Sequence, residues 1–309
     1  MTHAKDEPFV VLADARGPGK STALRELRDA YEGRSPVALM DGEETRFERP
    51  PPGRPAESWS PVYEALSTIA EQLAAPVAGT GRVAFPRLAC GLLAVAAGGW
   101  SDREAGRLRE EAERALLLSG TGGPPGRPAG RWTGKVVARL VSSVSTSASG
   151  TGTGPVVEAI VEAALEAFTE GMSPSYRRLR RGAVWYRDYP CAAGSPKLGL
   201  VLLARHFRAG GDARAHAERH LVRALLADLG DAGAGGGRPV ILIDNVQEAA
   251  GLRVMESVLR DRAAGIADRA VFYAGLRGRD HPALRHATRT SDWVPGRAPS
   301  SRALLVSLP

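Results

Sequence analysis

Five short runs of apolar residues stand apart along the chain, and each has the length of a buried β-strand. They are Phe9–Ala13, Val37–Met40, Val240–Ile243, Ala270–Ala274 and Leu304–Leu308. The runs are continuous rather than alternating, which is typical of strands covered on both faces in a parallel sheet. Segments with helical periodicity follow the first, third and fourth runs, at Ser21–Glu32, Ala249–Ala264 and Ala283–Thr290. This alternation predicts an α/β fold with a five-stranded parallel sheet.

A long segment without strand-like runs separates the second and third predicted strands. Apolar residues recur there at helical spacing, in Ser58–Leu73, Asp102–Leu118, Trp132–Val144, Val156–Phe168, Leu198–Arg208 and Asp212–Leu229. Stretches rich in Pro and Gly, at 53–61 and 120–130, are typical of loops. We therefore predict an α/β core made of residues 1–48 and 238–309, interrupted by a mainly α-helical insertion at 49–237.

The turn between the first predicted strand and its helix carries the clearest candidate chemistry. Residues 14–22 read Asp-Ala-Arg-Gly-Pro-Gly-Lys-Ser-Thr. Backbone N–H groups in a glycine-rich turn and at a helix N-terminus bind phosphate oxygens well. The segment resembles the Walker A loop of P-loop NTPases, whose pattern is GxxxxGK[ST], although Asp14 replaces the first glycine.

This resemblance implies a site for ATP and Mg²⁺. The residues that would contact the nucleotide are Arg16, Gly17, Pro18, Gly19, Lys20, Ser21 and Thr22. Lys20 would reach the β- and γ-phosphates, and the Ser21 hydroxyl would bind Mg²⁺.

Two later strands extend the resemblance. Val240–Asp244 is an apolar run ending in Asp and resembles a Walker B strand, whose Asp holds the water shell of Mg²⁺. The strand after it leads into Arg277, and it is similar to the sensor strand of STAND and AAA+-type NTPases, which ends near the γ-phosphate. The chain therefore resembles the STAND/AAA+-like (ASCE) division of P-loop NTPases over residues 8–48 and 238–309. This implies a three-layer α/β sandwich.

The residue that would orient the attacking water is less clear. Many ATPases of this division have Glu directly after the Walker B Asp, where this chain has Asn245. Glu248 lies four residues after Asp244, and Glu43 or Glu44 follows the second predicted strand. The sequence leaves these substitutes open.

The composition indicates in which compartment the protein resides, but its net charge does not identify a binding partner. No apolar stretch reaches the ~20 residues that span a bilayer, and Lys5, Asp6 and Glu7 interrupt the N-terminal segment, so we expect no signal peptide and a cytoplasmic protein. Two cysteines, Cys90 and Cys191, suit a reducing compartment. The net charge is +7, but all but four of the 41 basic residues are Arg, a bias that also follows from GC-rich coding.

Two further patterns in the insertion have mainly structural interpretations. Residues 176–189 interleave arginines with Trp185, Tyr186 and Tyr189, as a nucleic-acid surface or a helix packed by its aromatics would. His216 and His220 share a helix face, but the zinc-peptidase motif HExxH needs Glu directly after the first His, and Glu218 comes one position later. We therefore do not predict a zinc site.

Together these features predict an ATP- and Mg²⁺-binding P-loop NTPase that acts as a nucleotide-dependent switch with slow hydrolysis. The predicted catalytic residues are Lys20, Glu43, Glu248 and Arg277, and the predicted Mg²⁺ ligands are Ser21 and Asp244. The helical insertion is a candidate surface for a protein partner, and assembly into a homo-oligomer is compatible with the pattern. Two alternatives stay open: a nucleotide-binding interaction module that does not hydrolyse ATP, and an ATPase that handles nucleic acid.

Overall fold

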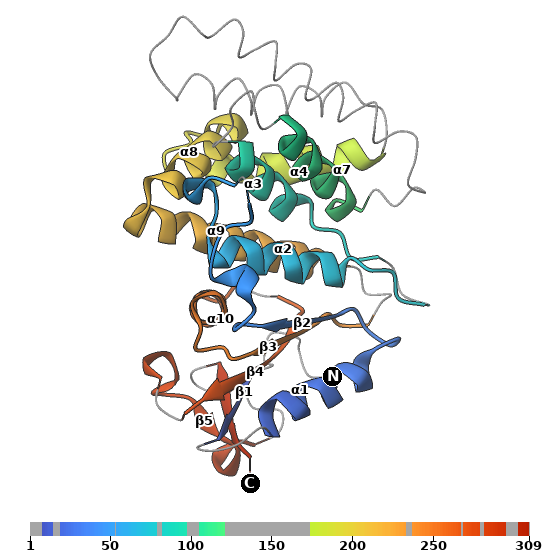
Figure 1. The fold of residues 1–309 in the computed structure, drawn as a ribbon, viewed down its shortest axis with the longest axis vertical. Coiled ribbons are helices and arrows are strands. Elements are labelled where there is room, and N and C mark those ends of the chain that lie inside the picture. The colour runs from blue at the N-terminus through green and yellow to red at the C-terminus, as the bar shows by residue number, and fades with distance from the viewer. Residues whose placement is uncertain are drawn as a thin grey trace, which may run out of the picture. The chain divides into compact units, whose positions relative to one another are not determined.

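A computed structural model of the chain describes residues 8–14, 19–52, 54–78, 82–97, 105–120, 174–232, 237–266, 268–278, 281–294 and 302–308 (Figure 1). The helices expected at Trp132–Val144 and Val156–Phe168 lie outside these residues. The chain divides into two compact units. The α/β unit comprises Met1–Arg49, Pro61–Val83 and Leu225–Pro309, and the helical unit comprises Pro50–Ser60 and Ala84–Ala224.

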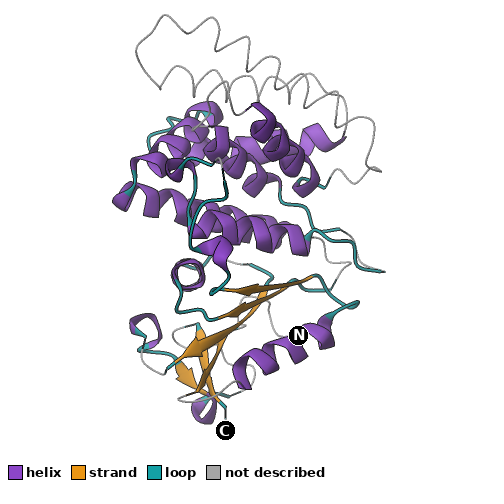
Figure 2. Cartoon of the chain, in the orientation of Figure 1, coloured by secondary structure: helices purple, strands orange, loops and turns teal. Residues whose placement is uncertain are grey.

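A parallel sheet forms the centre of the α/β unit (Figure 2). Its strands are β1 (Phe9–Asp14), β2 (Val37–Asp41), β3 (Val240–Asp244), β4 (Val271–Arg277), β5 (Thr288–Arg289) and β6 (Ala303–Ser307). Their order is β2-β3-β4-β1-β6-β5, and every neighbouring pair is parallel. The prediction of an α/β fold with a parallel sheet is thus confirmed, and all five apolar runs form strands.

The predicted number of five strands is wrong, because β5 adds a sixth. Thr288 and Arg289 pair with Leu304 and Leu305 of β6 through the backbone. The helix predicted at Ala283–Thr290 is not formed. The segment instead contains the 3₁₀ turn Pro282–Leu284, then β5, and then the start of the 3₁₀ turn Thr290–Asp292. Two polar residues at a sheet edge leave no apolar run in the sequence, so the pattern gave no indication of the strand.

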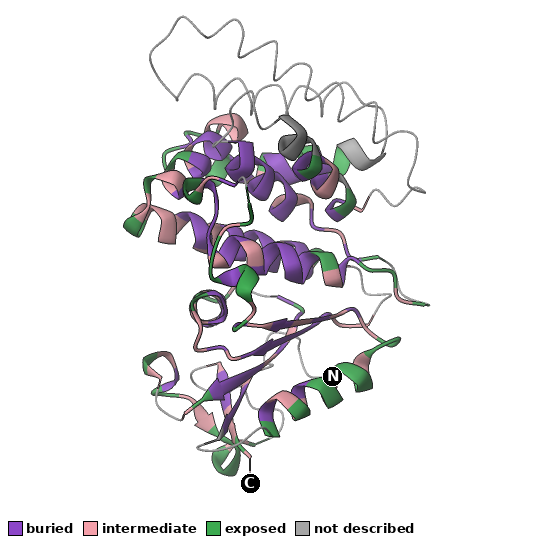
Figure 3. Cartoon of the chain, in the orientation of Figure 1, coloured by how far each residue is buried: buried purple, intermediate pink, exposed green. Residues whose placement is uncertain are grey.

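Helices cover both faces of the sheet, as the continuous apolar runs predict. On one face, α1 (Gly19–Tyr31) packs Leu24 against Leu12 and Leu242. On the other, α10 (Ala249–Ala263) brings Gly251 against Ile243 of β3, and it packs against α2 (Pro61–Leu73) (Figures 1 and 3). Buried residues of β3 thus alternate between two apolar layers.

Helix α2 belongs to the α/β unit although it lies within the predicted insertion at 49–237. It packs on β2, which is an edge strand. The Gln72 amide donates to the backbone O of Leu39 at 3.0 Å and accepts from the backbone N of Leu39 at 2.9 Å. Gln72 therefore pairs with both the N–H and the C=O of Leu39, which face away from β3 at the edge of the sheet.

The helical unit consists of short helices in close contact. They are α3 (Pro86–Ala97), α4 (Ala105–Leu118), α7 (Pro174–Val184), α8 (Pro196–Ala209) and the first part of α9 (Gly211–Asp231), with the 3₁₀ helices η3 (Ala56–Ser58) and η5 (Trp185–Asp188). A methyl group at Gly199 of α8 would lie 1.9 Å from the backbone O of Tyr186, so this close approach requires glycine. Helix α9 continues into the α/β unit at Leu225 and leads to β3.

None of the helices in the described ranges is both long and apolar enough to cross a membrane.

The Gln72 contact makes a prediction about stability. Gln72→Ala should lower the free energy of unfolding of the α/β unit by about 1–3 kcal/mol, because it leaves the N–H and C=O of Leu39 without partners. Chemical denaturation followed by circular dichroism measures this loss. Glu26→Ala, at an exposed position of α1, is the control and should change stability by less than about 0.5 kcal/mol. Equal stability of the two variants would contradict the role given to Gln72.

Candidate functional site

The strand order reverses at β1, and polar residues gather at the carboxyl ends of the strands beside it. From β1 the chain crosses to β2 at one edge and returns through β3 to β4, beside β1. It then passes β1 to reach β5 at the other edge, and turns back to β6 between β5 and β1. In open parallel sheets, ligands bind outside the carboxyl ends of the strands where such a reversal occurs. Asp41, Asp244 and Arg277 are the last residues of β2, β3 and β4, so charged residues end three neighbouring strands on one side of β1.

Lys20 and Asp244 both lie close to Gly275. Lys20 is in the first turn of α1 and is 9% exposed, and Asp244 is 8% exposed. A methyl group at Gly275 would lie 2.8 Å from Asp244 Oδ1 and 3.5 Å from Lys20 Cβ. Glycine in β4 therefore leaves the space in which these two predicted site residues approach each other.

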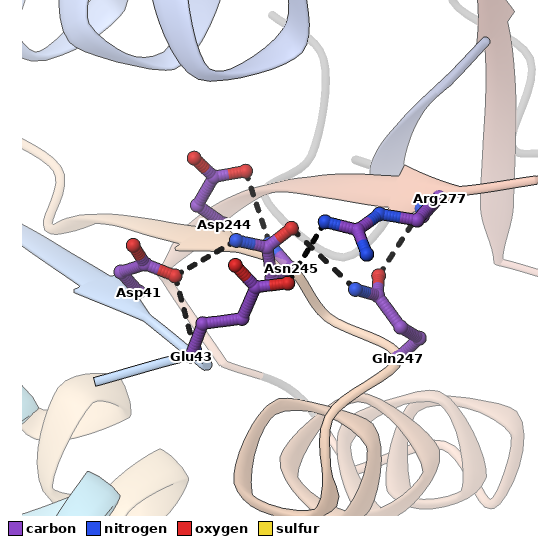
Figure 4. A network of polar contacts seen from close by, with 6 residues as sticks. All are labelled: Asp41, Glu43, Asp244, Asn245, Gln247 and Arg277. Carbon is purple, nitrogen blue, oxygen red and sulfur yellow. Dashed lines mark hydrogen bonds and ion pairs between the residues drawn. The ribbon is translucent and has the colours of Figure 1, made fainter. Parts of the chain in front are cut away.

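Asn245 connects the ends of β2 and β3 (Figure 4). Its Nδ2 donates to Asp41 Oδ1 at 2.9 Å, and its backbone N donates to Asp244 Oδ1 at 3.0 Å. Its φ of 49° is in the left-handed region, which Asn adopts more readily than most residues. Gln247 Nε2 donates to Asn245 Oδ1 at 3.4 Å, and Gln247 Oε1 accepts from the backbone N of Arg277 at 3.1 Å. Hydrogen bonds thus join the ends of three strands.

Two predicted catalytic residues form an ion pair within this network. Arg277 Nη2 lies 2.8 Å from Glu43 Oε1, and the backbone N of Glu43 donates to Asp41 Oδ1 at 3.1 Å. The side chains of Arg277 and Glu43 are 71% and 44% exposed, so solvent screens their attraction. Both groups can therefore change partners at small cost in free energy.

The remaining predicted residues are placed less closely. Gly19, Ser21 and Thr22 lie in the first turn of α1, with Ser21 half-buried and Thr22 exposed. Arg16, Gly17 and Pro18 lie outside the described residues. Glu248 precedes α10, and within the described part of the chain its carboxylate makes no hydrogen bond to the Asn245 network.

Three contributors to this site were not predicted from the sequence: Asp41, Gln247 and Gly275. A glycine inside a buried strand marks close approach of another group, so Gly275 carried a usable signal. Asp41 also carried one, because it ends an apolar run as Asp244 does. Gln247 carried none, since its role depends on the turn after β3.

The donors present suit a hydrated Mg²⁺ ion better than a metal held by protein alone. Across the residues with described positions, no three or more His, Cys, Asp or Glu side chains are grouped to hold a metal. Mg²⁺ usually keeps several waters and is bound by one or two carboxylates together with substrate phosphates. The buried Asp244 carboxylate, with Oδ1 against Gly275, fits that mode of binding.

No protein-family model matches the chain, and searches of curated proteins and of solved structures give no significant match.

The two histidines of α9 lie in a separate aromatic cluster in the helical unit. The ring of His220 lies 4.7 Å from the rings of both Trp185 and Tyr189, and that of His216 lies 5.7 Å from Tyr189. The Nε2 atoms of both histidines are buried and have no hydrogen-bond partner in the described structure. Burial, with the charge of Arg223 as a smaller cause, lowers the pKa of His220 to about 3. These histidines are neutral packing residues at neutral pH.

The lowered pKa of His220 predicts loss of stability in acid. Between its ordinary pKa of 6.5 and about 3, the unfolded chain binds a proton at His220 that the folded chain does not. The titration of His220 therefore leaves the free energy of unfolding unchanged above pH 6.5. Between pH 6.5 and about 3 it lowers that free energy by about 1.4 kcal/mol per pH unit. Chemical denaturation of wild type and His220→Leu at pH 7, 6 and 5 measures how much more stable the wild type is than the variant. This difference in the free energy of unfolding should shrink as the pH falls, because only the wild type loses stability through His220. The exposed His286→Leu is the control, and a wild-type pH dependence retained in His220→Leu would refute the assignment.

Proposed function

We propose that the α/β unit binds a Mg²⁺–nucleoside triphosphate, ATP in our interpretation, and acts as a nucleotide-dependent switch with slow hydrolysis. One observation carries this proposal: Lys20 Cβ and Asp244 Oδ1 both lie close to Gly275 of β4, the strand that pairs with β1 where the strand order reverses. The ammonium of a lysine at a helix N-terminus and a carboxylate at the end of a neighbouring strand are the groups that a Mg²⁺-bound phosphate chain requires. The Walker A and Walker B resemblances assign the same two residues to that role.

In this proposal the phosphates bind at the N-terminus of α1. The positive end of the helix dipole and the Lys20 ammonium both favour anions there. Asp244 and the Ser21 hydroxyl would hold Mg²⁺, which would neutralise charge on the phosphate oxygens when bound. Gly275 leaves room for the Asp244 carboxylate close to the start of the Lys20 side chain.

Arg277 and Glu43 supply the switch in this proposal. An exposed ion pair is worth about 0–1 kcal/mol, whereas a guanidinium–phosphate contact is charge-assisted and can be bidentate. A bound triphosphate therefore competes well for Arg277. When Arg277 turns to phosphate, the Glu43 carboxylate is released and becomes able to orient a water molecule. The backbone of Glu43 stays hydrogen-bonded to Asp41, which limits how far the carboxylate moves.

A specific observation favours the second candidate, a nucleotide-binding module without turnover. Asn245 occupies the position where related ATPases carry Glu, and its amide is engaged with Asp41. An amide does not accept a proton as a carboxylate does. Glu43 and Glu248 are then the remaining candidates for orienting the attacking water. If neither acts in this way, the site would still bind nucleotide but would not hydrolyse it.

Binding is tested at Lys20. Lys20→Ala should weaken ATP binding in the presence of Mg²⁺ by at least about tenfold, because a charge-assisted contact to phosphate is lost. Isothermal titration with a non-hydrolysable ATP analogue measures the affinity. Arg28→Ala removes one positive charge from the exposed last turn of the same helix and should change affinity by less than twofold. Equal affinities for wild type and Lys20→Ala would remove the nucleotide site from this position.

Turnover is tested at the three carboxylates that follow β2 and β3. Glu43→Gln should lower steady-state phosphate release tenfold or more while leaving nucleotide affinity near that of wild type, because it removes the group that orients water. Glu44→Gln is the matched control, since the Glu44 carboxylate is next in sequence but pairs with Arg46 instead of Arg277. A fall in Glu248→Gln with normal rates in Glu43→Gln would transfer the role to Glu248. Absence of release from the wild type would favour the module without turnover.

A further inference from the structure

The surface of α7 carries arginines without an acidic counterpart on the helix. Its sequence, Pro-Ser-Tyr-Arg-Arg-Leu-Arg-Arg-Gly-Ala-Val, contains no Asp or Glu. Arg177, Arg178, Arg180 and Arg181 are all exposed. Within the described residues, the polar contact of these four is that of Arg178 Nη1 with the backbone O of Gly120, at 3.3 Å. The face is therefore positively charged and open to solvent.

Packing on the opposite side of α7 fixes the direction of this face. Leu179 and Ala183 are buried, and Cys90 Sγ of α3 contacts the backbone O of Leu179 at 3.3 Å. A methyl group at Gly182 would lie 2.3 Å from the backbone O of Pro86 at the start of α3. Because the two helices approach so closely, α7 cannot rotate without a clash. The arginines are thus held outward by the core of the helical unit.

The arrangement of the arginines is unfavourable in the absence of an anion. Arg177 and Arg181 are separated by four positions, and Arg177 and Arg180, like Arg178 and Arg181, by three. Residues at these spacings are neighbours on a helix, and like charges there destabilise it by about 0.2–0.5 kcal/mol for each pair. A ligand with several negative charges would relieve this repulsion at all three pairs.

The neighbouring side chains determine which anion fits. Tyr186 and Tyr189 are buried, and their hydroxyl groups contact Arg87 O at 2.9 Å and His206 Nδ1 at 2.8 Å, so their rings are not available to stack on bases. Among the large apolar side chains in the described part of α7, Val184 is the exposed one, at 40%. Protein interfaces need an apolar, charge-depleted centre, which this face lacks, whereas nucleic-acid interfaces are polar and strongly positive.

We propose that the exposed face of α7 binds the phosphate backbone of a nucleic acid without reading its bases. Arg guanidinium groups pair with phosphate oxygens, and such contacts position a protein on a duplex without carrying sequence information. The inference rests on the helical unit alone and does not depend on the nucleotide site of the α/β unit.

The experiment uses the full chain in EDTA without nucleotide, so that failure of the proposed nucleotide site does not affect it. Fluorescence anisotropy measures binding to a labelled 20-base-pair DNA duplex and to single-stranded DNA and RNA of the same length, from 50 to 200 mM NaCl. The test variant is Arg177→Gln, Arg180→Gln and Arg181→Gln combined. The control combines Arg25→Gln, Arg28→Gln and Arg285→Gln, which removes the same charge from exposed positions elsewhere.

We expect wild type to bind duplexes of unrelated sequence equally, with affinity that falls steeply as salt rises. The α7 variant should bind at least tenfold more weakly at 50 mM NaCl, and the magnitude of its log–log salt slope should fall by nearly one for each arginine that meets a phosphate. The control should stay within twofold, and circular dichroism should show that both variants fold. Preference for one strand type identifies the source of the phosphates and supports the proposal. Equal losses in both variants, stronger binding to polyglutamate than to DNA, or no binding by wild type would overturn it.

Discussion

The geometry of the candidate site depends on the turn that follows β3. Asn245 adopts a left-handed backbone conformation there, and this conformation directs the chain sharply away from the strand. As a result, the backbone N of Val246 donates to the O of Gly275 at 2.9 Å, which ties the turn to β4. The backbone N of Gly42 donates to the O of Asp244 at 3.0 Å, which ties β2 to β3. A residue less tolerant of positive φ would strain this turn and loosen all three strand ends at once.

Much of this architecture was predictable because burial on both faces leaves a direct mark on the sequence. Val240–Ile243 is continuous and apolar since each residue meets either the α1 layer or the α10 layer. The same logic failed at β5, where Thr288 and Arg289 join the sheet only through backbone hydrogen bonds. For α2, amphipathic spacing shows that the helix has a buried face but not which partner covers it, so the sequence did not indicate its packing on β2. Gln72 provides the decisive contact, and a single polar residue gives no periodic signal.

The candidate site shows a similar division between local and long-range information. Lys20 and Asp244 were predicted because each lies in a short motif whose meaning is local. The role of Asn245 was missed, since the Walker B resemblance presents it as the loss of a carboxylate. In the structure its side-chain amide donates to the Asp41 carboxylate and its backbone N donates to that of Asp244. A Glu at this position would lose the amide donor and add a third negative charge, which the other two carboxylates would repel. The hydrogen bond to Asp41 joins residues 204 positions apart in sequence, and no local pattern encodes such a pairing.

The arginine-rich segment at 176–189 shows how burial decides between two interpretations of one composition. Interleaved arginines and aromatics are compatible with a stacking surface or with a packed helix, and the sequence does not separate them. In the structure Tyr186 and Tyr189 are buried, and Arg177, Arg178, Arg180 and Arg181 are exposed. The described part of the segment therefore packs on one side and presents charge on the other. The two charged regions of the chain therefore differ in kind. Near the strand ends, Lys20 and Arg277 are accompanied by Asp41, Glu43 and Asp244, so any anion that bound there would have to compete with carboxylates. The sequence of α7 itself contains no carboxylate, and among the described residues its arginines form no ion pair, so the α7 surface differs from the strand ends in offering positive charge without a paired negative charge.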